Sequence, residues 1–353
     1  MEDQNKDFYN YGNLLSQKDS EGKKPGIFMV EGNRTGGKTF GGKKRCMKRF
    51  LENGEKFALI VRRGKAVKNQ YLPFGADLKT SWILDGEFSS RIIEKDLVAE
   101  NFYNDKSIGY TISIHNPGRI KEISSMFVDV QREFFDEFQE ENNQYLPKEA
   151  EKLFSVHTSI ARGGGGHSRY VELIMCANQA SMYNPYYLQF DLTRRIRPDS
   201  KFVKAPGVVL ERCYIEQAAD EIRNSGIGRA YQNSDQLKFS VGEEYLLDSK
   251  NLIKKFGGDK QLIMNLKYGG KLFGIWVTKE GLYYVSRKNN PQHPYTLAGT
   301  VRDHDENTVF IKYRNYTKML INAFNSGKVF FEDGYCKNVF FEVVGFNNYF
   351  TDK

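Results

Sequence analysis

Residues 27–39, IFMVEGNRTGGKT, join a short, largely apolar segment to a glycine-rich loop. The segment is typical of a buried strand, and GNRTGGKT at 32–39 matches G-x-x-x-x-G-K-[ST]. In this motif the glycines let main-chain amides turn around phosphate oxygens, the lysine adds positive charge, and the final hydroxyl can ligate Mg²⁺. A merely flexible loop is the alternative. We predict that this loop binds ATP, that Lys38 is also catalytic and that Thr39 is also a metal ligand. The predicted ATP-binding residues of the loop are Gly32, Asn33, Arg34, Thr35, Gly36, Gly37, Lys38 and Thr39.

The residues that follow alternate between helical and strand patterns. A helix is expected over about 38–52, ended by Gly54, and FALIV at 57–61 is expected to form the next strand. Strand, loop, helix and strand in this order open a parallel α/β sheet. Further strands are expected at 110–114, 133–135 and 170–177, and an amphipathic helix at 147–161.

Hydrolysis of a bound nucleotide also requires an acidic residue at a strand end for Mg²⁺ and a base that orients water. REFFDEF at 132–138 offers Asp136 as the metal ligand and Glu137 as the catalytic base. MFVDV at 126–130 competes, but Asp129 there is followed by valine instead of glutamate. The first pair could alternatively be the acidic start of a helix. We predict that Asp136 and Glu137 form the site.

Polar residues after two other strands could complete this site. Asn178 ends the apolar run LIMCAN and could sense the γ-phosphate, or merely cap its strand. Arg62 follows the second strand and is predicted to contact ATP, although the basic cluster around it could equally be a solvated charge run. Arg162 and Arg169 flank four glycines in RGGGGHSR, which is either a flexible connector or a loop that offers an arginine to a neighbouring nucleotide.

The composition changes after residue 200. Residues 1–200 are predicted to form the ATPase domain, and residues 201–245 a linker with a helical segment at 204–233. Residues 246–353 become strand-rich, with three strands and glycine turns within 261–287. We predict a strand at 309–313, a helix near 317–326, and a second, smaller α/β domain that ends with 329–344.

Charge and composition restrict the class of protein. The 353 residues carry a formal charge of +8, which favours a polyanionic partner, either nucleic acid or an acidic membrane. Four scattered cysteines form no CxxC pair, so a reducing cytoplasm is expected in place of disulfides or zinc. The polar, acidic start MEDQNKD predicts no signal peptide, and no apolar run approaches the ~18 residues of a membrane span. We expect a soluble intracellular protein without a membrane partner.

The motifs in their order resemble the DNA-packaging ATPases of phi29-like podophages. The resemblance rests on GNRTGGKT, then GEKFALIVRR, FFDEFQEENNQYLP and CANQASMYNPYYLQFDL, with KLFGIWVTKEGLYYV and FNSGKVFFEDG farther on. It implies a P-loop ATPase core of the additional-strand, FtsK/terminase-like type with a parallel central sheet, a linker, and an RNase H-like α/β C-terminal domain. It also implies an ATP- and Mg²⁺-dependent motor that moves double-stranded viral DNA into a prohead.

The same resemblance implies partners and residue roles. Family motors form five-subunit rings in the host cytoplasm, transiently at the portal vertex of the prohead, and some members use a structural packaging RNA. By position, Arg162 matches the arginine that acts on the neighbouring subunit, with Arg169 as the alternative. Lys65 and Lys121 lie near family positions that grip DNA.

Related terminases use the C-terminal fold as a metal-dependent nuclease with carboxylates on its first strand. In this chain the corresponding strand, LIMNLKY at 262–268, carries Asn265 and no aspartate. A vestigial nuclease domain that binds nucleic acid or a prohead component is therefore expected. Two other functions stay open: a terminase-like ATPase with an active nuclease, and a nucleotide-switched DNA-binding protein that does not translocate.

Overall fold

The computed structural model describes residues 9–344, apart from 70, 82–83, 142–143, 163–167, 182–183, 194, 197–199, 243–251, 255–256 and 311–313. The chain divides into two compact units. The first comprises Met1–Glu140, Glu149–Ala180 and Arg195–Leu246, and the second Glu141–Lys148, Ser181–Arg194 and Leu247–Lys353.

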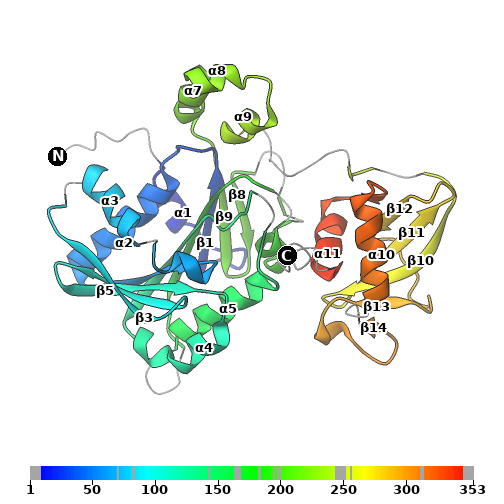
Figure 1. Ribbon diagram of the computed structural model, residues 1–353, viewed down its shortest axis with the longest axis horizontal. Coiled ribbons are helices and arrows are strands. Elements are labelled where there is room, and N and C mark those ends of the chain that lie inside the picture. Colours follow the sequence, from blue (N-terminus) through cyan, green and yellow to red (C-terminus); the bar gives the residue numbers. More distant parts are fainter. Residues whose placement is uncertain are drawn as a thin grey trace. The chain divides into compact units, whose positions relative to one another are not determined.

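A nine-stranded sheet in the order β3-β4-β5-β2-β6-β7-β1-β9-β8 forms the centre of the first unit (Figure 1). Its strands are β1 (Ile27–Gly32), β2 (Lys56–Val61), β3 (Phe88–Glu94), β4 (Val98–Tyr103), β5 (Lys106–Ser113), β6 (Val130–Asp136), β7 (Glu172–Asn178), β8 (Phe202–Ala205) and β9 (Val208–Cys213). Every pairing from β5 to β9 is parallel, and β3, β4 and β8 add antiparallel edges. The predicted parallel central sheet is confirmed.

The first unit has eight α-helices among the described residues: five lie before or between its strands, and the last three follow β9 along the chain. They are α1 (Gly12–Leu15), α2 (Lys38–Asn53), α3 (Tyr71–Ser81), α4 (Pro117–Glu122), α5 (Glu149–Ile160), α7 (Glu216–Asn224), α8 (Gly226–Ala230) and α9 (Asp235–Ser240). Helix α2 packs directly on β6, because a Cβ on Gly42 would lie 2.2 Å from the Phe134 ring. Adding a side chain at Gly42 would therefore separate the helix from the sheet.

Two parts of the secondary-structure prediction were wrong. The helix predicted over 204–233 contains strands β8 and β9 instead, and helix begins only at Glu216. Val209 and Leu210 are fully buried and pair with β1, so tertiary contacts on both faces outweigh local propensity. Strands β3 and β4, which no pattern predicted, form an antiparallel extension from β5.

The second unit has its own six-stranded sheet, in the order β14-β13-β10-β11-β12-β15. Its strands are β10 (Lys260–Tyr268), β11 (Lys271–Thr278), β12 (Tyr283–Ser286), β13 (Thr296–Ala298), β14 (Val309–Phe310) and β15 (Val329–Phe331). Helices α6 (Pro185–Gln189), α10 (Arg314–Asn325) and α11 (Gly334–Val344) belong to this unit, and α10 and α11 share its apolar core with the sheet. The predicted three-strand meander is confirmed, and so is the helix predicted near 317–326, which is α10. Of the strand predicted at 309–313, β14 covers Val309–Phe310, and 311–313 lie outside the described residues.

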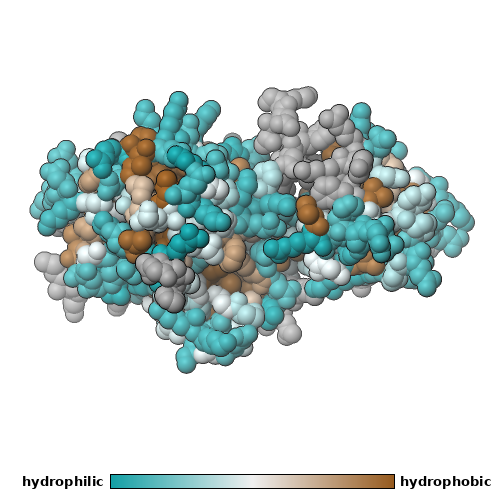
Figure 2. All heavy atoms as spheres, turned by 90° about the horizontal axis from the view of Figure 1, so that it is seen from below, coloured by the Kyte–Doolittle hydropathy of each residue, from teal (hydrophilic) through white to brown (hydrophobic). Residues whose placement is uncertain are grey.

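Within the described residues no helix has the length and apolar character to cross a bilayer. The face drawn in Figure 2 is mostly hydrophilic, with small, separate hydrophobic areas. Isolated apolar side chains of this kind are normal on a protein surface and require no ligand.

Candidate nucleotide-hydrolysis site

The predicted phosphate loop connects β1 to α2 and has the backbone that the motif requires. Gly37 caps α2 with φ 78°, a left-handed conformation that glycine adopts without strain. A Cβ on Gly32 would lie 2.0 Å from the Cys213 carbonyl oxygen of β9, so only glycine fits beside that strand. The loop is thus shaped by local backbone geometry and by a strand that is far away in the sequence.

Lys38 is buried at the start of α2. Its side chain is 7% exposed, and Nζ donates to the main-chain oxygen of Asn33 at 2.6 Å. Burial lowers the pKa of Lys38, because the charged ammonium loses water contacts. A phosphate anion at this position would restore a counter-charge, so the loop fits a nucleotide.

Asp136 ends β6 beside the phosphate loop. Its Oδ1 accepts hydrogen bonds from Thr39 Oγ1 at 2.9 Å, from Cys176 Sγ at 3.0 Å and from the main-chain N of Glu137 at 3.0 Å. Hydroxyl and carboxylate oxygens are the ligands that Mg²⁺ prefers. Thr39 and Asp136 therefore fit the predicted metal site, and they are brought together across 97 residues of sequence.

Glu137 follows directly, with an exposed side chain and φ 55°. A left-handed φ is strained for glutamate and is maintained only where neighbouring groups hold it. Arg62 does so, since its NH1 and NH2 both donate to the Glu137 main-chain oxygen at 3.2 Å, and NH2 donates to that of Phe138 at 3.0 Å.

The same guanidinium is committed to two carboxylates. Its Nε donates to both oxygens of the fully buried Glu149 at 2.9 Å, and NH1 pairs with Glu140 at 2.8 Å. Arg62 was predicted to contact ATP. The geometry favours a different role, in which Arg62 positions the loop that carries Glu137.

Replacing Arg62 with alanine is expected to lower the free energy of unfolding by about 3–5 kcal/mol, because it leaves the Glu149 carboxylate buried without its partner. Chemical denaturation would measure the loss. Arg63→Ala, at the exposed neighbouring position, is the matched control and should change stability by no more than about 0.5 kcal/mol. Equal stabilities of the two variants would contradict the positioning role.

Asp129, the competing acidic residue, lies elsewhere. It precedes Val130, the first residue of β6, whereas Asp136 is the last, so ~20 Å of strand separates them. Its carboxylate pairs with Lys56 Nζ at 2.7 Å. The alternative site at Asp129 is therefore wrong.

Asn178 ends β7 in register with Gly32, at the edge of the sheet where the phosphate loop begins. Sequence reasoning missed several residues that hold this loop. Asn33 exchanges two hydrogen bonds with the main chain of Ile215, at 2.9 and 3.0 Å, and the Arg34 main-chain N donates to Ser240 O at 3.0 Å. The loop is thus tied to the segment 214–240, whose relation to it no sequence pattern indicates.

Arg162 and Arg169 differ in what they contact. The Arg169 guanidinium donates to the main-chain oxygens of Phe127, Val130 and Ile160, which gives it a structural role. Arg162 is exposed at the end of α5 and forms an isolated bridge with Ser168. The glycines between them lie outside the described residues. Of the two candidates, Arg162 is the one available for a neighbouring molecule.

The predicted DNA-contacting lysines are both exposed. Lys65 lies in a short 3₁₀ turn after β2, and Lys121 lies in α4 after β5. Strands β2 and β5 are neighbours, so both residues follow the same edge of the sheet as the phosphate loop.

In the second unit, Asn265 is fully buried on β10 and pairs with Thr296 of β13 and Gly274 of β11. Its Nδ2 donates to the Asn290 main-chain oxygen at 2.8 Å, and its Oδ1 has no hydrogen-bond partner. Over the part of the chain that the structure describes, no group of three His, Cys, Asp or Glu side chains could hold a metal.

Comparisons place these features among known proteins. A family model described as Podovirus DNA encapsidation protein (Gp16) matches residues 4–348. The DNA packaging protein of Bacillus phage phi29 is 26% identical over 324 residues, which cover 89% of this chain and 92% of that protein. That of Bacillus phage B103 is 25% identical over 323 residues, covering 89% and 95%.

Two solved structures share the fold over nearly the whole length. The bacteriophage Phi-29 viral genome packaging motor assembly gives a TM-score of 0.61 at 22% identity, covering 97% of this chain and 99% of that one. The Phi-28 gp11 DNA packaging motor gives 0.64 at 17% identity, covering 96% and 98%. Because the family model spans almost all of the sequence, the chain belongs to the Podovirus DNA encapsidation protein (Gp16) family.

Proposed function

We propose that this protein is an ATP-driven motor that translocates double-stranded viral DNA into a prohead. The observation that carries the proposal is the meeting of Lys38, Thr39, Asp136 and Glu137 at the carboxyl edge of one parallel sheet. Its relatives in phages phi29 and B103 are DNA packaging proteins. The formal charge of +8 favours the same polyanionic substrate.

The four residues have separate roles in hydrolysis. Lys38 would neutralise charge on the β- and γ-phosphates, and Thr39 and Asp136 would hold Mg²⁺, which lowers the charge of the phosphate oxygens when bound. Glu137 would orient the attacking water and accept its proton. The Arg62 hydrogen bonds keep Glu137 at the end of β6. Asn178, one strand away, would sense the γ-phosphate.

Arg162 would act on the ATP of a neighbouring subunit. Helix α5 returns the chain from the carboxyl end of β6 to the amino end of the parallel strand β7, so Arg162 lies at the edge remote from its own phosphate loop. Twelve helical residues correspond to about 18 Å, which is too far for an arginine side chain to cross. Action between subunits in a ring is thereby supported.

Family membership supports a proposal for the wider assembly. We propose a homopentameric ring in the host cytoplasm that docks transiently at the prohead portal, with a packaging RNA as a further partner. Lys65 and Lys121 would grip DNA through its phosphates, so binding should be independent of sequence and weaken as salt rises.

We also propose that residues 246–353 form an RNase H-like domain without nuclease activity. Of the predicted linker 201–245, only the part after β9 would lead into that domain, because β8 and β9 belong to the sheet of the first unit. The antiparallel meander β10-β11-β12, extended by the parallel strands β13 and β14, supports this fold. The neutral Asn265 on the first strand of that sheet supports the loss of cleavage, because metal-dependent nucleases need carboxylate ligands.

The full-length protein is therefore expected to leave supercoiled plasmid intact in the presence of Mg²⁺ or Mn²⁺, as measured by gel electrophoresis over hours. A Lys38→Ala version serves as the control that separates cleavage from ATP-driven activity. Nicking or linearisation by both proteins would contradict the vestigial assignment and favour a terminase-like nuclease.

ATP turnover with and without duplex DNA, on free protein and on protein bound to proheads, tests the proposed motor. We expect DNA and proheads to stimulate hydrolysis. Slow turnover that neither of them changes would favour a nucleotide-switched DNA-binding protein that does not translocate.

A further inference from the structure

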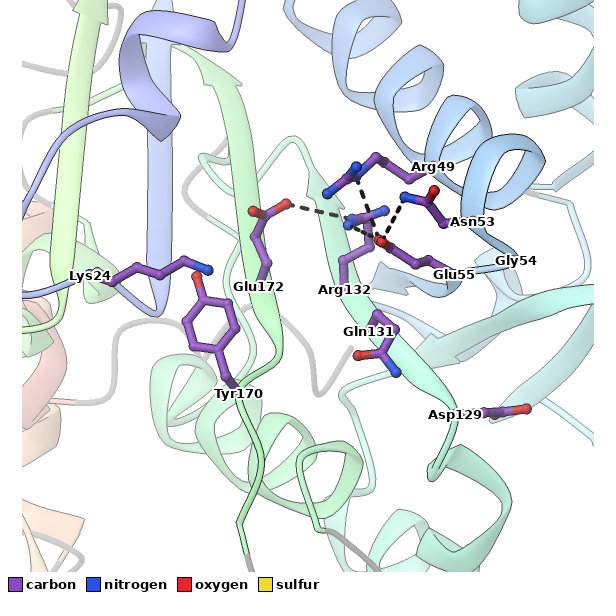
Figure 3. Close-up of a pocket in the computed structure, with 10 residues that line it drawn as sticks. All are labelled: Lys24, Arg49, Asn53, Gly54, Glu55, Asp129, Gln131, Arg132, Tyr170 and Glu172. Carbon is purple, nitrogen blue, oxygen red and sulfur yellow. Dashed lines mark hydrogen bonds and ion pairs between the residues drawn. The ribbon is translucent and has the colours of Figure 1, made fainter.

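A pocket in the first unit carries positive charge that the hydrolysis site does not use (Figure 3). It has a volume of about 400 Å³ and lies at the starts of β6 and β7 and the end of α2. Lys38 and Asp136 lie at the opposite ends of α2 and β6, so this pocket is separate from the nucleotide site.

Arg132 contributes a buried guanidinium to the pocket. The residue is 4% exposed; its NH2 donates to Glu55 Oε2 at 2.5 Å, and its Nε faces Glu172 Oε1 at 3.5 Å. Neither Nε nor NH1 has a hydrogen-bond partner. A buried donor without a partner costs about 1–3 kcal/mol and is rare. The ion pairs within the chain therefore do not satisfy this arginine.

The surrounding ion pairs also leave a surplus of cations. Arg45 donates to both oxygens of Glu172, and Arg49 Nε lies 3.6 Å from Glu55, so with Arg132 three arginines share two glutamates. Burial raises the pKa of Glu55, but hydrogen bonds from Arg132 and Asn53 outweigh it and lower the pKa overall. Both glutamates are thus already engaged with arginine.

Lys24 adds a fourth cation on the other side of the pocket. Its Nζ lies 3.9 Å from the centre of the Tyr170 ring. Asp129, the remaining acidic lining residue, is neutralised by Lys56 at 2.7 Å. The carboxyl end of α2 is the negative end of the helix dipole and cancels roughly half of one positive charge. The pocket therefore retains an excess of more than one positive charge.

We propose that this pocket binds a phosphate group, held by Arg49 and Lys24 above the buried Arg132. A phosphate monoester carries about −1.5 to −2 charges at neutral pH, which matches the excess, and in a nucleic-acid backbone neighbouring phosphodiesters of one negative charge each would supply it together. Arginine binds phosphate with two parallel hydrogen bonds, and lysine acts as a point charge. The 44% exposed Tyr170 ring at the rim offers a surface for a sugar or base.

Two sources could supply the phosphate: a nucleic-acid backbone or a free nucleotide. The double variant Lys24→Ala/Arg49→Ala removes both accessible cations and leaves Arg132 in place. Lys23→Ala/Lys48→Ala is the matched control, because it removes two exposed lysines at the adjacent positions, each paired only with a nearby surface glutamate. Both double variants should hydrolyse ATP without DNA at the wild-type rate, which separates this site from the proposed hydrolysis site.

Binding is measured on protein saturated with Mg²⁺ and a non-hydrolysable ATP analogue. The probes are a fluorescent 30-base-pair duplex, by anisotropy, and AMP and inorganic phosphate, by calorimetry. We expect Lys24→Ala/Arg49→Ala to weaken at least one probe tenfold or more, while the control matches wild type. Weaker duplex binding with a salt slope reduced by about 2 assigns the backbone, and weaker binding of AMP or phosphate assigns a free nucleotide.

Equal binding by the two double variants in every phosphate arm overturns the proposal. So does a failure of wild type to bind any phosphate probe at this second site. A polyglutamate peptide is the last arm: if Lys24→Ala/Arg49→Ala weakens only that peptide, the pocket receives an acidic protein segment, and the phosphate assignment is wrong.

Discussion

Glu137→Gln is expected to bind ATP at near wild-type affinity and to hydrolyse it about 10²–10⁴ times more slowly, because the amide cannot accept the proton of the attacking water. Lys38→Ala should instead lose turnover together with tight ATP binding, since it removes the buried ammonium that would neutralise the phosphates. Equilibrium binding of a fluorescent ATP analogue and steady-state phosphate release measure the two effects separately.

Asp129→Asn is the matched control for the glutamate. Its carboxylate lies at the other end of β6 and pairs with Lys56, so turnover should stay close to the wild-type rate. If Glu137→Gln keeps wild-type hydrolysis while Asp129→Asn loses it, the acidic pair at the end of β6 is not the catalytic site. Loss of ATP binding by Glu137→Gln would likewise argue against its role as the base.

Arg162→Ala should bind ATP normally and lose about 10³–10⁵-fold in turnover within a pure ring, because under the proposed mechanism the arginine would stabilise charge on the transferring phosphoryl group of a neighbour. Arg169→Ala is expected to destabilise the fold instead, since its guanidinium holds three main-chain oxygens. Thermal unfolding distinguishes the two outcomes.

Mixing inactive subunits tests whether Arg162 acts between chains. In a mixed ring, an Arg162→Ala subunit retains Glu137, and a Glu137→Gln subunit retains Arg162, so an intact pair can form at one interface. We expect partial recovery of hydrolysis in rings shown to contain both variants. An absence of recovery would mean that Arg162 and Glu137 act on the same ATP within one chain. Recovery only with Arg169→Ala would mean that Arg169, and not Arg162, acts on the neighbouring subunit.

The hydrolysis site could be predicted only where its determinants are local. The phosphate loop occupies eight consecutive residues, and Gly37 adopts its left-handed φ within that segment. Glu137 follows Asp136 directly, so the pair could be named, but the choice against Asp129 required the limits of β6. The predicted strand covered only 133–135, whereas β6 runs over Val130–Asp136 and includes the charged Arg132 and Glu133.

Both of those residues are buried by partners that are distant in the sequence. Arg132 pairs with Glu55, 77 residues away, and the fully buried Glu133 lies 3.1 Å from His157 Nδ1. Burial of a charge is tolerated only when such a partner is present, and periodicity along one strand cannot reveal it. The same limitation explains why Arg62 was assigned to ATP before its contacts with Glu149 and the Glu137 main chain were known.

The sequence by itself determined the glycine-rich loop between β1 and α2, the parallel α/β core, the meander of the second unit and the family, because these depend on short motifs and regular alternation. Only the tertiary structure decided that β8 and β9 extend the sheet and that Arg62 positions Glu137. It also placed Arg162 at the edge remote from its own phosphate loop, and brought Lys24, Arg49 and Arg132 together at a pocket away from that loop. Each of these features depends on contacts between residues that are far apart in the chain. Such contacts contribute free energy only once the sheet has formed.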